Sequence, residues 1–116
     1  MSETEITWGE VKELEEGSYS LIDIRDDSSV AYGMIPGARQ IVQSKLEESL
    51  EELPKDRLLI LYCMRGIFSV EAAEMLREHG FQAKSLKGGY ASWLVSQMEE
   101  EKEQDPEQNR AAEIEL

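Results

Sequence analysis

Short apolar runs alternate with amphipathic segments along the chain. Residues 19–24 and 58–62 are β-rich and largely apolar, which is typical of strands buried on both faces of a parallel sheet. Leucines at 46, 50 and 53 have the spacing of an amphipathic helix. The full pattern predicts strands ending at Ile6 and covering 19–24, 58–62 and 81–86, a short apolar piece at 40–42, and helices from Thr7, over 44–53, over 69–79 and from Tyr90 to about Met98.

Capping and turn residues mark the ends of the predicted helices. Thr7 and Glu10 have the spacing of a capping box, and Gly17 ends the helix that they begin. Pro54 closes the second helix, and Gly80 stands where a glycine commonly terminates a helix.

The alternation of strands and helices predicts a single α/β domain over residues 1–98, with a mainly parallel central sheet and helices on both faces. Residues 58–62 are the most apolar run and the best candidate for the central strand. Right-handed crossovers then place functional loops at the carboxyl ends of the strands. Residues 99–116 are strongly acidic and predict a C-terminal tail that is either a helical extension or disordered.

Composition narrows the functional classes. Twelve Lys plus Arg against 25 Asp plus Glu give a net charge of −13, so we expect neither nucleic acid nor a membrane as a partner. The single cysteine, Cys63, excludes an intramolecular disulfide, and with the single histidine, His79, it leaves too few ligands for structural zinc. We expect no metal and no other cofactor.

The sequence begins without a signal-peptide pattern, and together with the lone cysteine this predicts a cytoplasmic protein.

The loop after the predicted central strand carries the candidate chemistry. It runs from Cys63 to the start of the next helix, where backbone N–H groups and the helix dipole favour an anion. Arg65 adds a full positive charge. These features stabilise a thiolate, so Cys63 is the candidate catalytic nucleophile. The candidate substrate-binding residues are Met64, Arg65, Gly66, Ile67, Phe68 and Ser69.

Several motifs, in this order and spacing, resemble the single-domain rhodaneses, a family of sulfurtransferases. The stretches that carry the resemblance are L-I-D-I-R at 21–25, G-M-I-P-G-A at 33–38, L-I-L-Y-C-M-R-G-I-F-S at 59–69, A-A-E-M-L-R-E-H-G-F at 72–81 and L-K-G-G-Y-A-S-W at 86–93. The resemblance implies a rhodanese fold. It also implies that Cys63 accepts sulfane sulfur from a small-molecule donor such as thiosulfate or a persulfide, becomes a persulfide, and passes the sulfur to a thiophilic acceptor.

Two other functions remain open. The related phosphatases and arsenate reductases have a seven-residue loop that follows a histidine, whereas the loop from Cys63 to Phe68 has six residues and follows Tyr62. This difference disfavours a Cys-dependent phosphatase or arsenate reductase. A non-catalytic rhodanese module for binding or sensing is the other alternative, since Met34 and Phe68 depart from the common family pattern while the cysteine is kept.

The same departures bear on the sulfur donor and the acceptor. Arg65 is the only basic residue in the loop, beside apolar Ile67 and Phe68, so we predict weak thiosulfate activity or a preference for a less charged persulfide. Because Cys63 has no partner cysteine, an external thiol must collect the sulfur. The resemblance implies a thioredoxin-like protein, a glutathione-like thiol or a sulfur-accepting protein.

The roles of the flanking residues are less specific. Asp23 and Arg25 match a D-x-R pattern of the family and are expected to support the site by tying a strand end to neighbouring loops. Gly66 either lets the loop approach the sulfur or serves a plain turn. Ser69 is either a simple helix N-cap or a hydrogen-bond donor to the persulfide.

Overall fold

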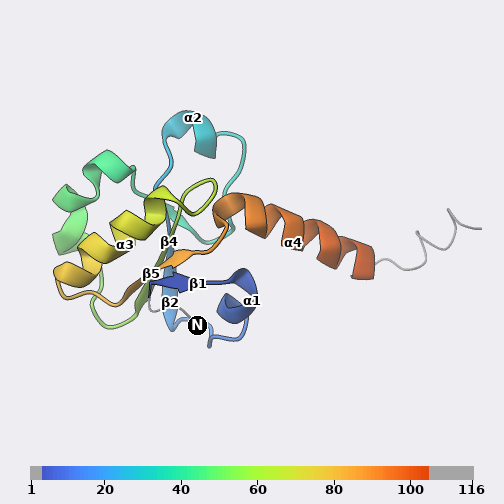
Figure 1. The fold of residues 1–116 in the computed structure, drawn as a ribbon, viewed down its shortest axis with the longest axis horizontal. Coiled ribbons are helices and arrows are strands. Elements are labelled where there is room, and N and C mark those ends of the chain that lie inside the picture. The colour runs from blue at the N-terminus through green and yellow to red at the C-terminus, as the bar shows by residue number, and fades with distance from the viewer. Residues whose placement is uncertain (1–3, 105–116) are drawn as a thin grey trace, which may run out of the picture.

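Five strands form one parallel sheet in the order β1-β5-β4-β2-β3 (Figure 1). The computed structural model describes residues 4–104. The strands are β1 (Glu5–Ile6), β2 (Tyr19–Asp23), β3 (Arg39–Gln40), β4 (Leu58–Tyr62) and β5 (Ala83–Leu86). Every pairing is parallel, and β4 lies in the centre between β5 and β2, as the apolar pattern predicts.

Helices cover both faces of the sheet, which confirms the predicted α/β architecture. One face carries α3 (Phe68–Glu78) with two 3-10 helices, η1 (Gln43–Lys45) and η2 (Glu47–Glu52). The other face carries α1 (Trp8–Val11) and α4 (Gly89–Gln104). A short helix, α2 (Asp27–Val30), lies in the connection between β2 and β3.

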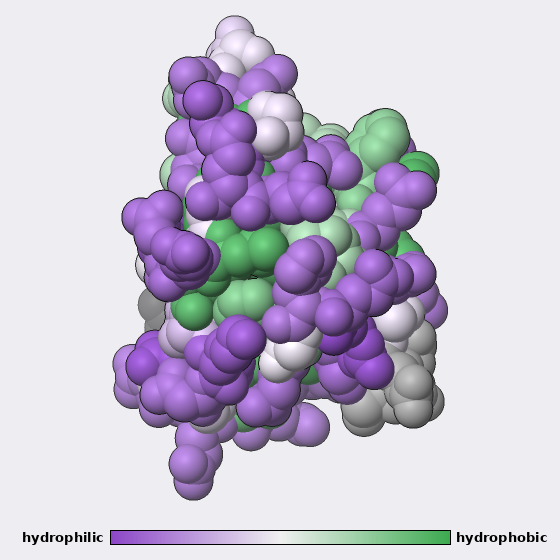
Figure 2. Space-filling model, turned by 90° about the vertical axis from the view of Figure 1, so that its left-hand side faces the viewer, coloured by the Kyte–Doolittle hydropathy of each residue, from purple (hydrophilic) through white to green (hydrophobic). Residues whose placement is uncertain are grey.

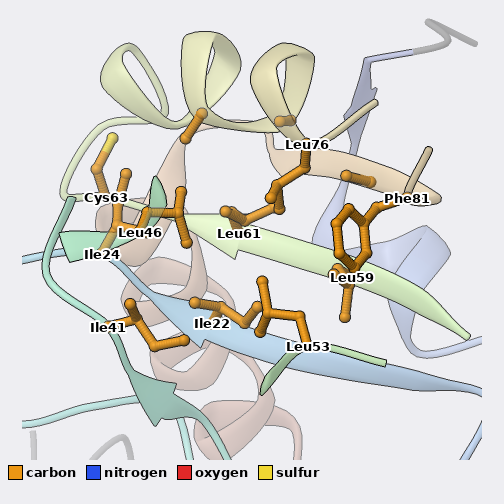
Figure 3. Packing of buried hydrophobic residues seen from close by; sticks show 13 residues of the cluster. Ile22, Ile24, Ile41, Leu46, Leu53, Leu59, Leu61, Cys63, Leu76 and Phe81 are labelled. Atoms are coloured by element: carbon orange, nitrogen blue, oxygen red, sulfur yellow. The ribbon is translucent and has the colours of Figure 1, made fainter. Parts of the chain in front are cut away.

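The central strand supplies side chains to two hydrophobic clusters, one on each face of the sheet. Leu59 and Leu61 belong to the cluster under α3, and Ile60 and Tyr62 belong to the cluster under α1 and α4. None of these four side chains is exposed. Cys63 belongs to the first cluster, and Figure 3 shows its sulfur at the end of that cluster where α3 begins.

The predicted capping signals have the expected geometry. Thr7 Oγ1 accepts a hydrogen bond from the Glu10 backbone N–H at 3.2 Å, and Glu10 Oε1 accepts one from the Thr7 backbone N–H at 2.9 Å. Gly80 follows the C-cap residue of α3 with a φ of +90°, and the next N–H, from Phe81, reaches back to the Leu76 carbonyl at 3.0 Å. Both helix ends are therefore set by local chemistry that the sequence displays.

The predicted α-helix over 44–53 is wrong. Leu46 and Leu53 are buried as the spacing predicts, but the backbone forms the two 3-10 helices η1 and η2, neither of which has a side-chain cap. An α-helix here would place glutamates four residues apart, Glu47 with Glu51 and Glu48 with Glu52, which repel one another on a helix surface. Short 3-10 segments bury the same leucines without requiring a longer helix.

Other element boundaries also differ from the sequence expectation. The α1 helix ends at Val11, well before Gly17, and the last strand begins at Ala83 instead of residue 81. The α4 helix continues past Met98 to Gln104, which agrees with the helical extension given as one of the two alternatives for the start of residues 99–116. Residues 105–116 lie outside the described part of the chain.

The surface reflects the acidic composition. Figure 2 shows the face over η2 and α3, which is largely hydrophilic around a small apolar area. On the opposite face, Lys12 beyond α1 forms an ion pair with Glu100 of α4. Among residues 4–104, no helix is both long and apolar enough to cross a membrane.

Candidate active site

Cys63 lies directly after β4, at the carboxyl edge of the sheet, and α3 begins five residues later at Phe68. We call residues 63–68 the cysteine loop. Only 6% of Cys63 is exposed, and it lines a hollow of about 580 Å³. The other residues around this hollow are Ile24, Arg25, Asp26, Ser29, Val42, Gln43, Ser44, Met64 and Phe68. Cys63 is thus buried, but the hollow connects it to the surface.

The cysteine loop surrounds the sulfur with hydrogen-bond donors. The Gly66 backbone N–H donates to Cys63 Sγ at 3.2 Å, and the Ser69 hydroxyl lies 3.5 Å from Sγ. Burial raises the pKa of the Cys63 thiol, whereas the hydroxyl and the backbone N–H of Ser69 lower it. The backbone N–H groups of Gly66 and Arg65 lower it further, so that the pKa lies below its ordinary value. The thiolate, which is the nucleophilic form, is therefore stabilised.

A second loop, between β5 and α4, holds the cysteine loop in place. The Tyr90 backbone N–H donates to the Cys63 carbonyl at 2.9 Å, and the Ala91 N–H donates to the Met64 carbonyl at 3.0 Å. These bonds use N–H groups at the start of α4, which have no partner within the helix. The L-K-G-G-Y stretch was part of the family resemblance, but the sequence analysis predicted no contact between it and the cysteine loop.

Glycine is required at two positions where these loops meet. A Cβ on Gly66 would lie 2.8 Å from the Gly88 nitrogen and 2.9 Å from the Leu86 oxygen, and a Cβ on Gly89 would lie 2.5 Å from the Cys63 oxygen. Gly66 also has a φ of +80°. Gly66 therefore makes a left-handed turn, as one of its two alternatives predicts, and the close approach that its missing Cβ allows is to the backbone of the second loop and not to the sulfur.

Asp23 and Arg25 form a buried ion pair beneath the site. The Arg25 guanidinium donates to both carboxylate oxygens of Asp23, with Nη2 to Oδ2 at 2.7 Å, and to the Gly33 carbonyl at 2.7 Å. Its Cζ atom lies 4.1 Å from the centre of the Tyr90 ring. Arg25 therefore joins the end of β2 to the following loop and to α4, and its charge is balanced by Asp23.

Ser69 is not the N-cap of α3, which corrects one of the two alternatives for this residue. The N-cap is Ile67, without a side-chain cap, and Ser69 lies inside the first turn. Its hydroxyl is completely buried between Cys63 Sγ and the hydroxyl of Ser85, whose oxygen is 2.6 Å away. Sequence reasoning missed Ser85, because only the pairing of β5 beside β4 brings it to the site.

The rim of the site is apolar. Met64, Ile67 and Phe68 are exposed by 43%, 68% and 62%. Arg65 is also exposed, and its side chain takes part in none of the ion pairs formed within residues 4–104. The substrate-binding residues predicted from the sequence thus form two groups. Gly66 and Ser69 are buried and face the sulfur, whereas the other four are exposed at the surface.

The carboxylate of Asp26 also lines the hollow. Asp26 caps α2, accepting the Ser29 backbone N–H at 2.9 Å, and this bond holds the pKa of the Asp26 carboxyl below its usual range. Because Arg25 is neutralised by Asp23, the hollow has no excess of positive charge along its lining.

A family model described as Rhodanese-like domain matches residues 8–96. This chain belongs to the rhodanese-like domain family. The match covers every described strand from β2 onward, the cysteine loop and the two-loop contact. The rhodanese fold accounts for the five-stranded parallel sheet with Cys63 at its carboxyl edge.

Relatives of this rhodanese domain include proteins named as sulfurtransferases. The putative sulfurtransferase YtwF of Bacillus subtilis is 38% identical over 73 residues, which are 63% of this chain and 71% of that protein. The thiosulfate sulfurtransferase GlpE of Shewanella oneidensis is 37% identical over 84 residues, 72% of this chain and 83% of that protein. The solved structure of the human single-domain sulfurtransferase TSTD1 superimposes with a TM-score of 0.72 at 28% identity, covering 82% of this chain and 97% of that one.

Proposed function

We propose that this rhodanese domain is a sulfurtransferase in which Cys63 carries sulfane sulfur as a persulfide. The observation that supports it most directly is the set of donors around Cys63 Sγ, which includes the Gly66 N–H at 3.2 Å and the Ser69 hydroxyl at 3.5 Å. These groups favour a thiolate without a neighbouring base. Such a nucleophile suits attack on sulfur, where no proton has to be removed in the step itself.

The proposed reaction has two displacement steps. The Cys63 thiolate attacks the sulfane sulfur of the donor, a new S–S bond forms, and the donor's S–S bond breaks. The donor leaves with the bonding electron pair, as sulfite from thiosulfate or as a thiolate from a persulfide. An external thiolate then attacks the outer sulfur of the Cys63 persulfide and leaves as a persulfide itself, which restores the Cys63 thiolate.

The charge distribution supports a weakly charged donor. Thiosulfate is a dianion, and the charged residues that line the hollow are Asp26 and Arg25, whose charge is balanced by Asp23. Arg65 of the cysteine loop is exposed to solvent. Apolar Phe68, which lines the hollow, takes a position from which a basic side chain would attract thiosulfate. We therefore propose slow turnover of thiosulfate and a preference for a persulfide with little net negative charge.

The acceptor is proposed to be an external thiol. Cys63 is the only cysteine of the chain, so a persulfide on it has no second cysteine with which to form an internal disulfide. A thioredoxin-like protein, a glutathione-like thiol and a sulfur-accepting protein all supply the required thiolate. The exposed apolar side chains of Met64 and Phe68 line the hollow by which that thiol reaches Cys63.

Intact mass spectrometry tests the carrier role. The protein is incubated with thiosulfate or with a low-molecular-weight persulfide and measured with and without dithiothreitol, beside Cys63→Ser as the control. We expect a reducible adduct of one sulfur atom, about 32 Da, on the wild type alone. If neither donor leaves an adduct, the proposal fails; a non-catalytic binding module becomes the better interpretation, and phosphatase substrates are assayed next.

A further inference from the structure

Two buried serine hydroxyls form a chain that ends on the Cys63 sulfur. Ser85 Oγ on β5 lies 2.6 Å from Ser69 Oγ at the start of α3, and Ser69 Oγ lies 3.5 Å from Cys63 Sγ. Both serines are 0% exposed. Ser85 therefore lies behind Ser69, on the side away from solvent, and touches no incoming substrate.

The number of available acceptors sets the direction of this chain. Within residues 4–104, the only hydrogen-bond partner of the Ser85 hydroxyl is Ser69 Oγ, whereas Ser69 Oγ has both Ser85 and Cys63 as partners. If Ser69 donated to Ser85, the Ser85 hydrogen would remain buried without an acceptor, which is costly. If Ser85 donates to Ser69, then Ser69 donates to the sulfur and both hydrogens are used.

The geometry points to Ser85 as a positioning residue, whose hydroxyl donates to Ser69 and thereby holds the Ser69 hydrogen toward the Cys63 sulfur. This inference rests on the proposed function, because the Ser69 hydroxyl is oriented toward the Cys63 sulfur, which is the proposed nucleophile. A thiolate accepts such a bond strongly, and a chain of hydrogen bonds strengthens each of its members. The pair of serines thus favours the thiolate over the thiol.

The backbone holds the Ser85 hydroxyl in place. The Ser85 N–H donates to the Thr4 carbonyl at 2.7 Å, and on the other side Ser85 lies in register with Leu61 of β4. A residue in the middle of a sheet has little freedom to move, so its hydroxyl provides a rigid reference for the side chain of Ser69.

The charged groups near the sulfur are Arg25 and Asp26, which line the hollow, and Arg65 in the cysteine loop.

The test is the pH dependence of Cys63 alkylation by iodoacetamide, because only the thiolate reacts. Wild type, Ser85→Ala, Ser69→Ala and the double variant are compared, with the three charged groups unchanged. We expect Ser85→Ala to move the profile to higher pH and to slow alkylation about threefold on its acidic side. Ser69→Ala is expected to slow it by about tenfold, since it removes the direct bond to the sulfur. Ser85 acts through Ser69, so the double variant is expected to match Ser69→Ala.

Two controls separate positioning from a general structural effect. Ser20→Ala removes a hydroxyl from β2 near the amino ends of the strands, away from the sulfur, and is expected to leave the profile unchanged. Ser85→Thr and Ser85→Val have nearly the same shape and differ in the hydroxyl. The threonine variant is expected to keep a profile nearer to the wild type, and this comparison carries the test even if Ser85→Ala does not fold.

The inference is overturned if Ser85→Ala is folded and its profile coincides with that of the wild type. It is equally overturned if Ser85→Thr and Ser85→Val behave alike, or if Ser85→Ala still slows the reaction in the Ser69→Ala background. Alkylation needs no sulfur donor. A wild type that accepts no sulfur but shows the expected profiles would therefore refute the proposed function and leave the role of Ser85 standing.

Discussion

Replacing Gly66 by alanine places a methyl group where the two loops at the active site meet. The new Cβ would lie 2.8 Å from the Gly88 nitrogen and 2.9 Å from the Leu86 oxygen, and both are backbone atoms that cannot rotate away. The φ of +80° adds a backbone cost of roughly 1–2 kcal/mol for a residue with a Cβ. Overpacking adds roughly 1–3 kcal/mol, so Gly66→Ala is expected to lower the free energy of unfolding by about 2–5 kcal/mol.

The chain contains a matched control. Gly17 has a φ of +87°, but a Cβ built on it meets no atom within 4 Å. Gly17→Ala is therefore expected to lower the free energy of unfolding only by the backbone cost of a positive φ, roughly 1–2 kcal/mol. The difference between the two variants in urea unfolding, at unchanged m-value, measures the close approach of the loops.

Gly66→Ala also has a chemical consequence. The Gly66 N–H donates to Cys63 Sγ at 3.2 Å, and relief of the steric clash must move this group. Cys63 alkylation at neutral pH is expected to become slower in Gly66→Ala and to stay unchanged in Gly17→Ala. Equal losses of stability in the two variants, together with equal alkylation rates, would refute the reasoning that the close contact requires glycine.

Further predictions concern the rim, the buried ion pair and the thiolate. Phe68→Arg adds a cation at the mouth of the hollow and is expected to raise kcat/KM for thiosulfate about tenfold in a cyanide assay. Little change is expected for a neutral persulfide, and an equal change for both donors would argue against charge as the cause. Arg25→Met leaves the Asp23 carboxylate buried without its partner and is expected to cost about 3–5 kcal/mol in guanidinium unfolding, so a loss below about 1 kcal/mol would contradict a structural role. Folding lowers the pKa of Cys63, so the thiolate stabilises the folded protein at every pH above the ordinary pKa of a thiol. This stabilisation is lost as the pH falls through the lower pKa that Cys63 has in the folded protein. The stability of the wild type relative to Cys63→Ala is therefore expected to increase with pH across that window, and a flat difference would show that the thiolate is not stabilised.

Local pattern determined much of this protein. Residues 58–62 are apolar at every position, a run that is typical of a central strand covered on both faces by helices. The position of Cys63 after that strand followed directly, as did the capping box at Thr7 and the glycine after α3. Each of these features depends on residues within a few positions of one another, so the sequence alone displays them.

Local pattern failed where two backbone conformations satisfy it equally. The leucine spacing at 46, 50 and 53 fits either one α-helix or two short 3-10 helices, and the structure has the second, in which the glutamates four residues apart are not stacked on one helix face. Serine is a common N-cap residue, but α3 begins before Ser69, at Phe68. In both cases the spacing of the apolar or capping residues does not by itself determine which backbone conformation forms.

The part of the candidate active site beyond the cysteine loop was decided by tertiary structure alone. Ser85 lies 16 residues from Ser69 along the chain, and their hydroxyls meet because β5 pairs with β4 and α3 packs across both strands. The N–H groups of Tyr90 and Ala91 reach the cysteine loop for the same reason. Contacts between neighbouring strands leave no periodic mark in the sequence, since they depend on the strand order and register that packing of the whole domain selects.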